Sequence, residues 1–277
     1  MDSIIAVILC LLTFVCFYPM WFVLMASLSS SSAVVSSSGV MFWPEGFSLK
    51  AYELVFSHKL YVSGIINSIK IEVLSLPINI IMTLLCGYFL SCTGMLLKKP
   101  ITAMILFTMY FGGGMIPAYL NVRNLGLYNS VWALVLTSAL SIYNAIICKT
   151  AIESIPNSLS ESAYIDGAND LQIIYKIIIP LIKPTLAVLI LYYGVGHWGS
   201  WFNASIYLKD NDKLPIQNVL RSVLILENDM AEADEFADYK ETIKYAAVIV
   251  STVPIMCIYP FLQKYFKKGV MMGAVKG

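Results

Sequence analysis

The sequence predicts an all-α integral membrane protein with six transmembrane helices. Hydrophobic residues make up 58% of its 277 residues and charged residues only 13%, whereas soluble domains average about 25% charged residues. The apolar residues gather in long runs, and a helix that crosses a bilayer needs about 20 of them in a row. A mean hydropathy of +0.76 agrees with these runs, so we expect most of the chain to lie in a membrane.

A single transmembrane domain is expected over residues 1–277. Its predicted spans cover residues 4–26, 64–95, 101–120, 131–151, 185–208 and 243–261. The alternative for the first run is a cleaved signal peptide, but this run would reach roughly 34 Å as a helix, which is too long. The residues before it also lack the basic segment that begins such a peptide. We therefore expect the first run to be a true span.

Basic residues set the expected orientation, because Lys and Arg are enriched at the cytoplasmic ends of spans. Lys98 and Lys99 follow the second predicted span. The C-terminal tail holds further lysines, namely Lys264, Lys267, Lys268 and Lys276. Long outer loops also hold basic residues, but long loops count less in setting orientation. Both termini, and the polar stretch of residues 153–184, are therefore expected in the cytoplasm.

The sequence lacks the motifs of several enzyme classes. It has no G-x-x-x-x-G-K-[ST] phosphate-binding loop, no H-E-x-x-H motif and no Ser-His-Asp order. Its two histidines do not suggest a metal site, and its six cysteines lie in predicted spans without metal or disulfide spacing. The net charge of +1 does not suggest a nucleic-acid partner. We expect no catalytic residue, metal or cofactor in this chain.

The polar stretch of residues 153–184 predicts two short helices joined at a glycine. Ser158 and Glu161 have capping-box spacing, which predicts a helix that starts at Ser158. Gly167 fits the left-handed residue that follows a helix. Asn169, with Gln172 three residues later, predicts the cap of a second helix. That helix can run to residue 179, where Pro180 should stop it.

The same stretch resembles the EAA loop of binding-protein-dependent ABC importer permeases. The residues that carry the resemblance are Glu161-Ser162-Ala163, Asp166-Gly167-Ala168, Ile177, Pro180 and Pro184. Ser162 departs from the alanine usual at that position. The resemblance implies the type I importer (MetI-like) permease fold, in which this stretch forms cytoplasmic coupling helices. It further implies that an ATPase docks on Glu161, Ala163, Asp166, Gly167 and Ala168, although Glu161 keeps its alternative role in the capping box.

Two further segments resemble the sugar-uptake branch of this family. Residues 122–127 resemble that branch, and residues 268–277 resemble the tail of oligosaccharide permeases of Gram-positive bacteria. The resemblance implies a multi-pass protein of the bacterial cell membrane that moves a carbohydrate, in particular an oligosaccharide. It also implies four kinds of partner: a second homologous permease subunit, a cytoplasmic ATPase dimer that holds ATP and Mg²⁺, an extracellular sugar-binding lipoprotein, and membrane lipid.

The outer half of the fifth predicted span is rich in aromatic and polar residues. The candidates for a substrate path are Tyr193, His197, Trp198, Trp201 and Asn203, together with Asn144 in the fourth span. Aromatic faces can stack on sugar rings, and His or Asn can hydrogen-bond hydroxyl groups. The alternative is the aromatic belt found at membrane interfaces.

Three other features each have two interpretations. Gly112–Gly114 allow either close helix packing or an unwound segment. Lys70 and Glu72 lie within a predicted span and cannot pair with each other along one helix, so they either snorkel or pair with a neighbouring helix, or they act in function. The acidic residues of the outer loop 209–241 form either a solvated face or a contact with the binding protein.

Two alternative functions remain open beside carbohydrate import. An ABC permease for an amino acid or peptide would share the EAA-like residues. A secondary transporter would work without an ATPase, and Lys70 and Glu72 would be its candidate ion relay. The sequence does not set the identity or linkage of the sugar, or whether the ATPase is dedicated or shared.

Overall fold

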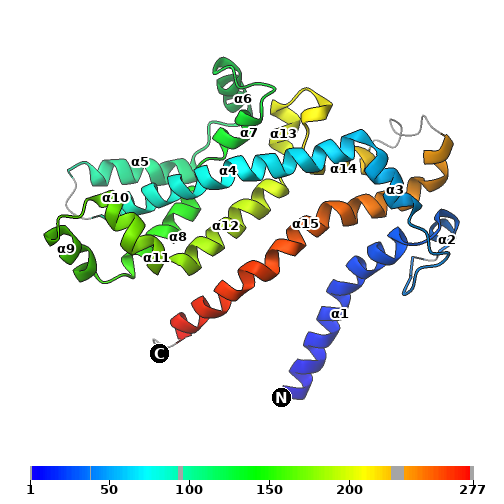
Figure 1. Cartoon of the computed structure of the whole chain (residues 1–277), viewed down its shortest axis with the longest axis horizontal. Coiled ribbons are helices and arrows are strands. Elements are labelled where there is room, and N and C mark those ends of the chain that lie inside the picture. Colours follow the sequence, from blue (N-terminus) through cyan, green and yellow to red (C-terminus); the bar gives the residue numbers. More distant parts are fainter. Residues whose placement is uncertain (1, 38, 93–95, 226–233, 275–277) are drawn as a thin grey trace. The chain divides into compact units, whose positions relative to one another are not determined.

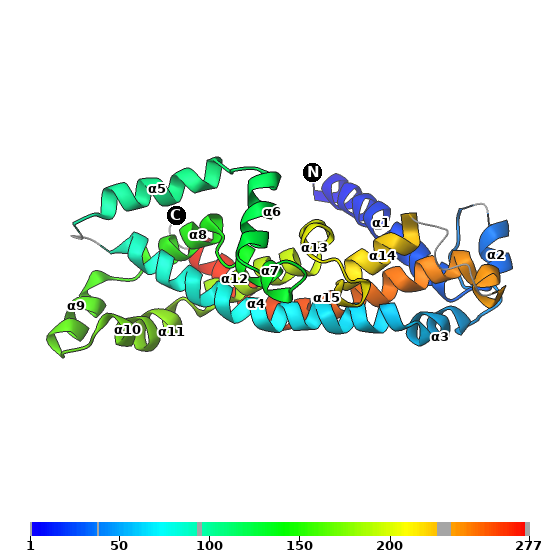
Figure 2. The same cartoon turned by 90° about the horizontal axis from the view of Figure 1, so that it is seen from above.

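The computed structural model describes residues 2–37, 39–92, 96–225 and 234–274, and these form helices and turns without a strand among them (Figure 1; Figure 2). The chain divides into two compact units. One comprises Met1–Asn67 and Leu214–Met256, and the other comprises Ser68–Lys213 and Cys257–Gly277. The long helices α4 (Lys59–Ser91) and α15 (Asp234–Ala274) contribute residues to both units.

Three helices are long and apolar enough to cross a membrane: α1 (Asp2–Ser27), α4 and α15. Three further stretches pass the same test only as pairs that bend at a short break. The pairs are α5 (Lys98–Tyr110) with α6 (Met115–Asn124), bent by 114°, α7 (Val131–Thr137) with α8 (Ile142–Glu153), bent by 48°, and Asp170–Leu181 with α12 (Lys183–Trp198), bent by 87°. Counting each pair as one span gives up to six spans in the described chain, as the hydropathy predicts.

The first unit packs the end of α1 against the loop that follows it. The indole N–H of Trp21 donates to the carbonyl oxygen of Phe42 over 3.0 Å, and the N–H of Met41 donates to the hydroxyl of Tyr18 over 3.1 Å. Met25 and Met41 are buried there together. The shorter helices of this unit are α2 (Ser31–Ser36), α3 (Lys50–Ser57) and α14 (Ile216–Ile225).

The core of the second unit lies where α4, α8 and the helices from Asp170 onward meet. Its buried residues are Leu84, Cys148, Ile152, Ile173, Ile174, Ile178, Ile182, Leu186 and Leu189. Cys148 is fully buried and lies against Gly87 of α4, where an added Cβ would stand 2.9 Å from the Cβ and Sγ atoms of Cys148. The missing side chain of Gly87 therefore sets how closely α4 and α8 approach.

The third predicted span is broken at its glycines. Helix α5 ends at Tyr110 and α6 begins at Met115, and Gly114 between them has φ +88°. A Cβ added at Gly112 or Gly114 would meet no atom within 4 Å. Within this chain, the glycines therefore allow the backbone between α5 and α6 to unwind, and they do not bring two helices into close contact.

Pro180 does not end the helix as the sequence predicts. Helix α10 (Asp170–Ile173) continues as the π-helix η1 (Ile174–Ile178) and then as α11 (Ile179–Leu181), so Pro180 lies inside a continuous helical stretch. The N–H of Ile179 bonds to the carbonyl oxygen of Ile174, five residues back. This wider turn relieves the clash of a proline ring with the preceding turn. The chain bends at Ile182 instead, before α12 begins.

The fifth predicted span, residues 185–208, is also divided. Helix α12 ends at Trp198, and the separate α13 (Phe202–Tyr207) follows after a short break. A 3₁₀ turn, η2 (Asn211–Lys213), comes next. The aromatic segment of this span therefore does not form one helical face.

A stripe of polar residues on α4 holds the break between α7 and α8. Ser68, Ser75, Asn79 and Thr83 are buried and recur at helical spacing. The amide Nδ2 of Asn79 donates to the carbonyl oxygen of Ser138 over 2.6 Å, and its Oδ1 lies 2.8 Å from Nε2 of His197. Since the amide oxygen only accepts, the ring N–H of His197 is the donor.

Tyr193 of α12 bonds the same break from the other side. The backbone N–H of Ser141 donates to the Tyr193 hydroxyl over 2.9 Å, and this hydroxyl lies 2.7 Å from Oγ1 of Thr83. Unwound backbone within a membrane must find partners inside the protein, because lipid offers none. Asn79 and Tyr193 supply these partners at the two ends of the α7–α8 break.

We expect Gly87→Ala to destabilise the protein by about 1–3 kcal/mol, because its Cβ would overpack Cys148. The matched control is Gly196→Ala, which also adds a methyl group within a helix but meets no atom within 4 Å. Thermal unfolding of the full chain in detergent measures both variants. Equal midpoints would contradict the close α4–α8 contact.

We expect Asn79→Ala to lower the unfolding free energy by about 1–3 kcal/mol, because it removes a fully buried side chain that donates to the carbonyl of Ser138 and accepts from His197. Asn203→Ala is the control, since the Asn203 side chain hydrogen-bonds to no other described residue. The same thermal unfolding assay applies. An unchanged midpoint for Asn79→Ala would show that water or another group can satisfy the break.

Candidate functional site

The first coupling helix begins one residue earlier than predicted, and its predicted capping box is absent. Helix α9 spans Asn157–Ile165 with Pro156 at its N-cap, and no side chain bonds to its first backbone N–H groups. Ser158 therefore lies inside the first turn, where its hydroxyl cannot cap the helix. The capping role predicted for Glu161 is wrong, so its exposed carboxylate remains available to a partner.

Gly167 ends α9 as predicted. Its φ is +79°, in the left-handed region that favours glycine. Its N–H donates to the carbonyl of Tyr164 over 3.0 Å, and the N–H of Ala168 donates to the carbonyl of Ala163 over 2.9 Å. These two bonds form a Schellman motif, which closes the end of the helix and fixes the direction of the next segment.

The second coupling helix has the capping box that the sequence predicts. The backbone N–H of Gln172 donates to Oδ1 of Asn169 over 2.9 Å, and the N–H of Asn169 donates to Oε1 of Gln172 over 3.0 Å. Two capped helices thus meet at Gly167. We call residues 157–173 the coupling corner.

The five predicted docking residues lie on two different faces of the coupling corner. Ala163 and Ala168 pack inward against the core of the unit, whereas Glu161 and Asp166 are exposed. Ile165 is 87% exposed, although the sequence analysis did not select it. Ile165 follows Ala163 by two residues, so on a helix it points away from the side of Ala163, and this spacing is the sequence feature that could have identified it. The other large exposed residues of this kind here are Leu159, Tyr164 and Leu171.

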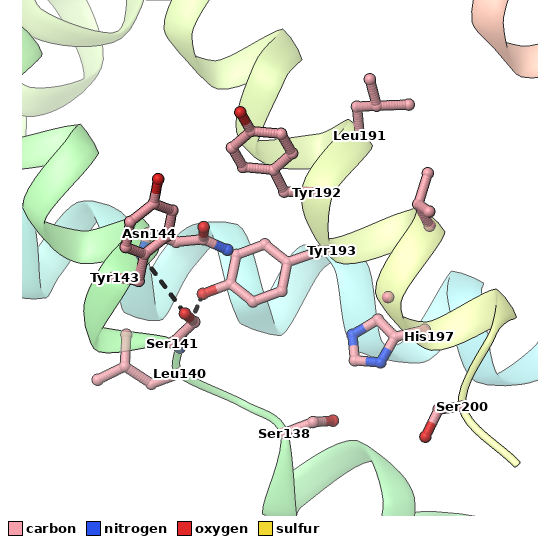
Figure 3. Close-up of a pocket in the computed structure, with 12 residues that line it drawn as sticks. Ser138, Leu140, Ser141, Tyr143, Asn144, Leu191, Tyr192, Tyr193, His197 and Ser200 are labelled. Atoms are coloured by element: carbon pink, nitrogen blue, oxygen red, sulfur yellow. Dashed lines mark hydrogen bonds between the residues drawn. The ribbon is translucent and has the colours of Figure 1, made fainter. Parts of the chain in front are cut away.

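A second candidate site is a pocket of about 760 Å³ beside the α7–α8 break (Figure 3). It lies between this break and the last turns of α12. Its lining residues are Ser138, Leu140, Ser141, Tyr143, Asn144, Leu191, Tyr192, Tyr193, Val195, Gly196, His197 and Ser200. Hydroxyl, amide and imidazole groups thus share the pocket with aromatic rings, and none of the lining residues is Lys or Arg.

The structure gathers three of the predicted substrate-path residues at this pocket. Asn144, Tyr193 and His197 all line it, and the Tyr193 ring stacks on the His197 ring with centroids 6.2 Å apart. Tyr193 is only 5% exposed, because its hydroxyl serves the α7–α8 break. The remaining candidates, Trp198, Trp201 and Asn203, do not line the pocket.

Tyr143 and Tyr192 present the exposed rings of the pocket, and the sequence analysis did not select either of them. They are 56% and 49% exposed, and Figure 3 shows both among the lining residues. In the sequence, Tyr192 stands directly before the selected Tyr193 in an aromatic run, and Tyr143 stands directly before the selected Asn144. Nothing in the sequence distinguishes either tyrosine from its neighbours. Only the break in the fourth span brings these two segments together.

Glu72 and Lys70 take separate environments on α4. Lys70 is exposed, while both carboxylate oxygens of Glu72 are buried. Glu72 faces α12, since a Cβ added at Gly194 would lie 3.8 Å from its Oε2 atom. Among the described residues, no ion pair joins Glu72 to Lys70.

The outer acidic loop is described only in part. Asp210 forms an ion pair with Lys213 at 2.8 Å and accepts a hydrogen bond from Nδ2 of Asn129 at 2.7 Å. Asp210 therefore ties the loop to the turn before α7. The predicted contact residues Glu227, Asp229 and Glu232 lie outside the described residues.

Comparisons with known proteins agree with this architecture. A family model described as "Binding-protein-dependent transport system inner membrane component" matches residues 2–272. The polygalacturonan/rhamnogalacturonan transport system permease protein YtcP of Bacillus subtilis (strain 168) is 38% identical over 100% of this chain and 98% of its own. Protein LplC of the same organism is 36% identical over 94% of this chain and 89% of its own.

A solved structure has the same fold along nearly the whole chain. It is the crystal structure of a bacterial ABC transporter involved in the import of the acidic polysaccharide alginate, with a TM-score of 0.88 and 32% identity over 96% of both chains. The type I importer permease fold that the EAA-like residues imply is thereby confirmed. This multi-pass membrane protein belongs to the family of binding-protein-dependent transport system inner membrane components.

Proposed function

We propose that this chain is one of two transmembrane subunits of an ATP-driven importer for a carbohydrate, in particular an oligosaccharide. The observation that carries the proposal is the coupling corner, a rigid double-capped turn on a membrane chain whose sequence has no phosphate-binding loop. In an ATP-driven importer, such a chain relies on another subunit to hydrolyse the ATP. The carbohydrate follows from relatives that are named for polygalacturonan and alginate transport.

In this proposal, a cytoplasmic ATPase dimer binds ATP and Mg²⁺ and docks on the exposed face of the coupling corner. Ile165 supplies an apolar anchor, and Glu161 and Asp166 supply flanking charges. Ala163, Ala168 and the glycine turn hold this face in place from behind. Both termini lie in the cytoplasm, and an external binding protein delivers the sugar on the opposite side. Docking drives transport only if it favours one of two arrangements of the spans.

The pocket beside the α7–α8 break is the proposed sugar path. Its volume of about 760 Å³ lies within the range of about 300–1,000 Å³ that is common for small-molecule sites. Tyr143 and Tyr192 offer ring faces, and Asn144 and Ser200 offer polar groups. Recognition here would rest on stacking and hydroxyl bonds, because the pocket lining lacks Lys and Arg.

The proposal is tested by purifying the chain gently from its own cell and identifying the proteins that accompany it. We expect an ABC ATPase and a second, homologous permease subunit. Uptake of labelled galacturonate and neutral galactose oligosaccharides into proteoliposomes then tests the cargo. Uptake by the chain alone without ATP would support a secondary transporter, and transport of only amino acids or peptides would refute carbohydrate import.

We expect Gly167→Asp to lower oligosaccharide uptake at least about tenfold while the importer still assembles, because φ +79° disfavours a side chain and the corner would shift. Gly126→Asp is the matched control, since Gly126 has φ +70° at a turn far along the chain from the coupling corner, and neither site has an atom within 4 Å of an added Cβ. Normal uptake by Gly167→Asp would contradict the docking role.

We expect Tyr192→Ala to lower uptake about two- to tenfold, as the loss of one aromatic contact of about 0.5–1.5 kcal/mol implies. Tyr110→Ala is the control, because Tyr110 is 85% exposed and lies outside the pocket. Uptake kinetics at several sugar concentrations separate affinity from rate. A loss for Trp201→Ala with normal uptake by Tyr192→Ala would place the path beyond the end of α12.

A further inference from the structure

Three side chains from three helices meet at the coupling corner, where Tyr164 and Asp170 are exposed. Tyr88 lies near the end of α4, Tyr164 lies on α9, and Asp170 is the first residue of α10. The hydroxyl groups of Tyr88 and Tyr164 donate to the same Oδ1 atom of Asp170, over 2.8 Å and 2.5 Å. The two hydroxyl oxygens lie 3.0 Å apart. One carboxylate oxygen therefore joins both coupling helices to a membrane span.

The charge state of this cluster favours strong bonds. Hydrogen bonds from Tyr164 and Tyr88 hold the pKa of Asp170 below its ordinary value. The bond to Asp170 in turn raises the pKa of Tyr164. Asp170 is therefore an anion at neutral pH and Tyr164 keeps its proton. Hydrogen bonds of this charge-assisted kind are stronger than neutral ones.

Apart from Ala163, no residue of α9 packs against the described core of the second unit. None of its side chains is fully buried, and a hollow of about 240 Å³ lies beside it, lined in part by Tyr88, Glu161 and Tyr164. Among the described residues, no other hydrogen bond joins α4 to the coupling corner. The helix thus has room to move, and the cluster at Asp170 is its polar attachment to α4.

Helix α4 continues from this cluster to the sugar pocket. Tyr88 lies just over one turn from Thr83, which bonds Tyr193, and Asn79 lies one turn further and bonds Ser138. We propose that Tyr88, Tyr164 and Asp170 form a latch through which α4 transmits movement of the coupling corner to the pocket. These three are positioning residues, and the inference rests on the proposed import function.

Tyr88→Phe and Tyr164→Phe test the latch, because each removes one hydroxyl group and keeps the ring. In the assembled importer in proteoliposomes, we expect each variant to lower the sugar moved per ATP hydrolysed by about five- to tenfold, with ATP hydrolysis and assembly retained. The double variant should lose less than the product of the two, because both hydroxyls share one acceptor. Tyr175→Phe is the matched control, since this tyrosine lies outside the cluster and is 73% exposed.

Several outcomes would overturn the latch. A purely structural role predicts that uptake, ATP hydrolysis and thermal stability fall together, and unchanged coupling in both variants would remove the role altogether. Hydrogen exchange of the full chain gives a readout that needs no ATPase: Tyr88→Phe should speed exchange in residues 157–173, and unchanged exchange counts against the latch. Uptake by the unmodified importer without ATP would instead refute ATP-driven import. The latch would then have no ATP-driven movement of the coupling corner to transmit.

Discussion

The structure depends on hydrogen bonding an interrupted backbone at membrane depth. The fourth span stops at Ser138 and restarts at Ser141, and lipid cannot satisfy the groups this frees. Asn79 of α4 binds one end of the break and Tyr193 of α12 binds the other. Ser138, Leu140 and Ser141 of this break line the pocket, so the hydrogen bonds from α4 and α12 to the break also hold one wall of the pocket.

The coupling corner and the pocket are joined by three routes within the second unit. The first is the chain itself, since residues 154–156 link α9 to α8, whose Tyr143 and Asn144 line the pocket. The other two start at Asp170: one runs through α10, η1, α11 and the bend at Ile182 into α12, and the other crosses to Tyr88 and runs along α4. These two routes meet again where Tyr193 and His197 of α12 bond to α4. They form a closed loop of contacts, which resists changes in the angle at Ile182.

The sequence predicts features that depend on neighbours in the chain or on composition. Hydropathy predicts a helical membrane fold with up to six spans, and short-range rules locate the turn at Gly167 and the cap at Asn169. The failures have two physical causes. Pro180 continues its helix because a π-turn before it absorbs the strain, and Pro156 takes the cap that Ser158 was expected to fill. The hydrogen bond from Asn79 to the carbonyl of Ser138 was missed because the two residues lie 59 positions apart. No local sequence pattern predicts a contact over that separation.

The closed loop also explains why the attachment of α9 is polar and small. A large apolar contact would hold the coupling corner firmly, but it would also fix α9 against α4 in a single arrangement. Two hydroxyl groups share one carboxylate oxygen here, and this oxygen has more than one lone pair to accept them, so the attachment needs only a small area of contact. Without this attachment, α4 would lose its hydrogen bonds to the coupling corner, and movement of the corner would reach α4 only through the apolar packing around Ala163 and Ala168.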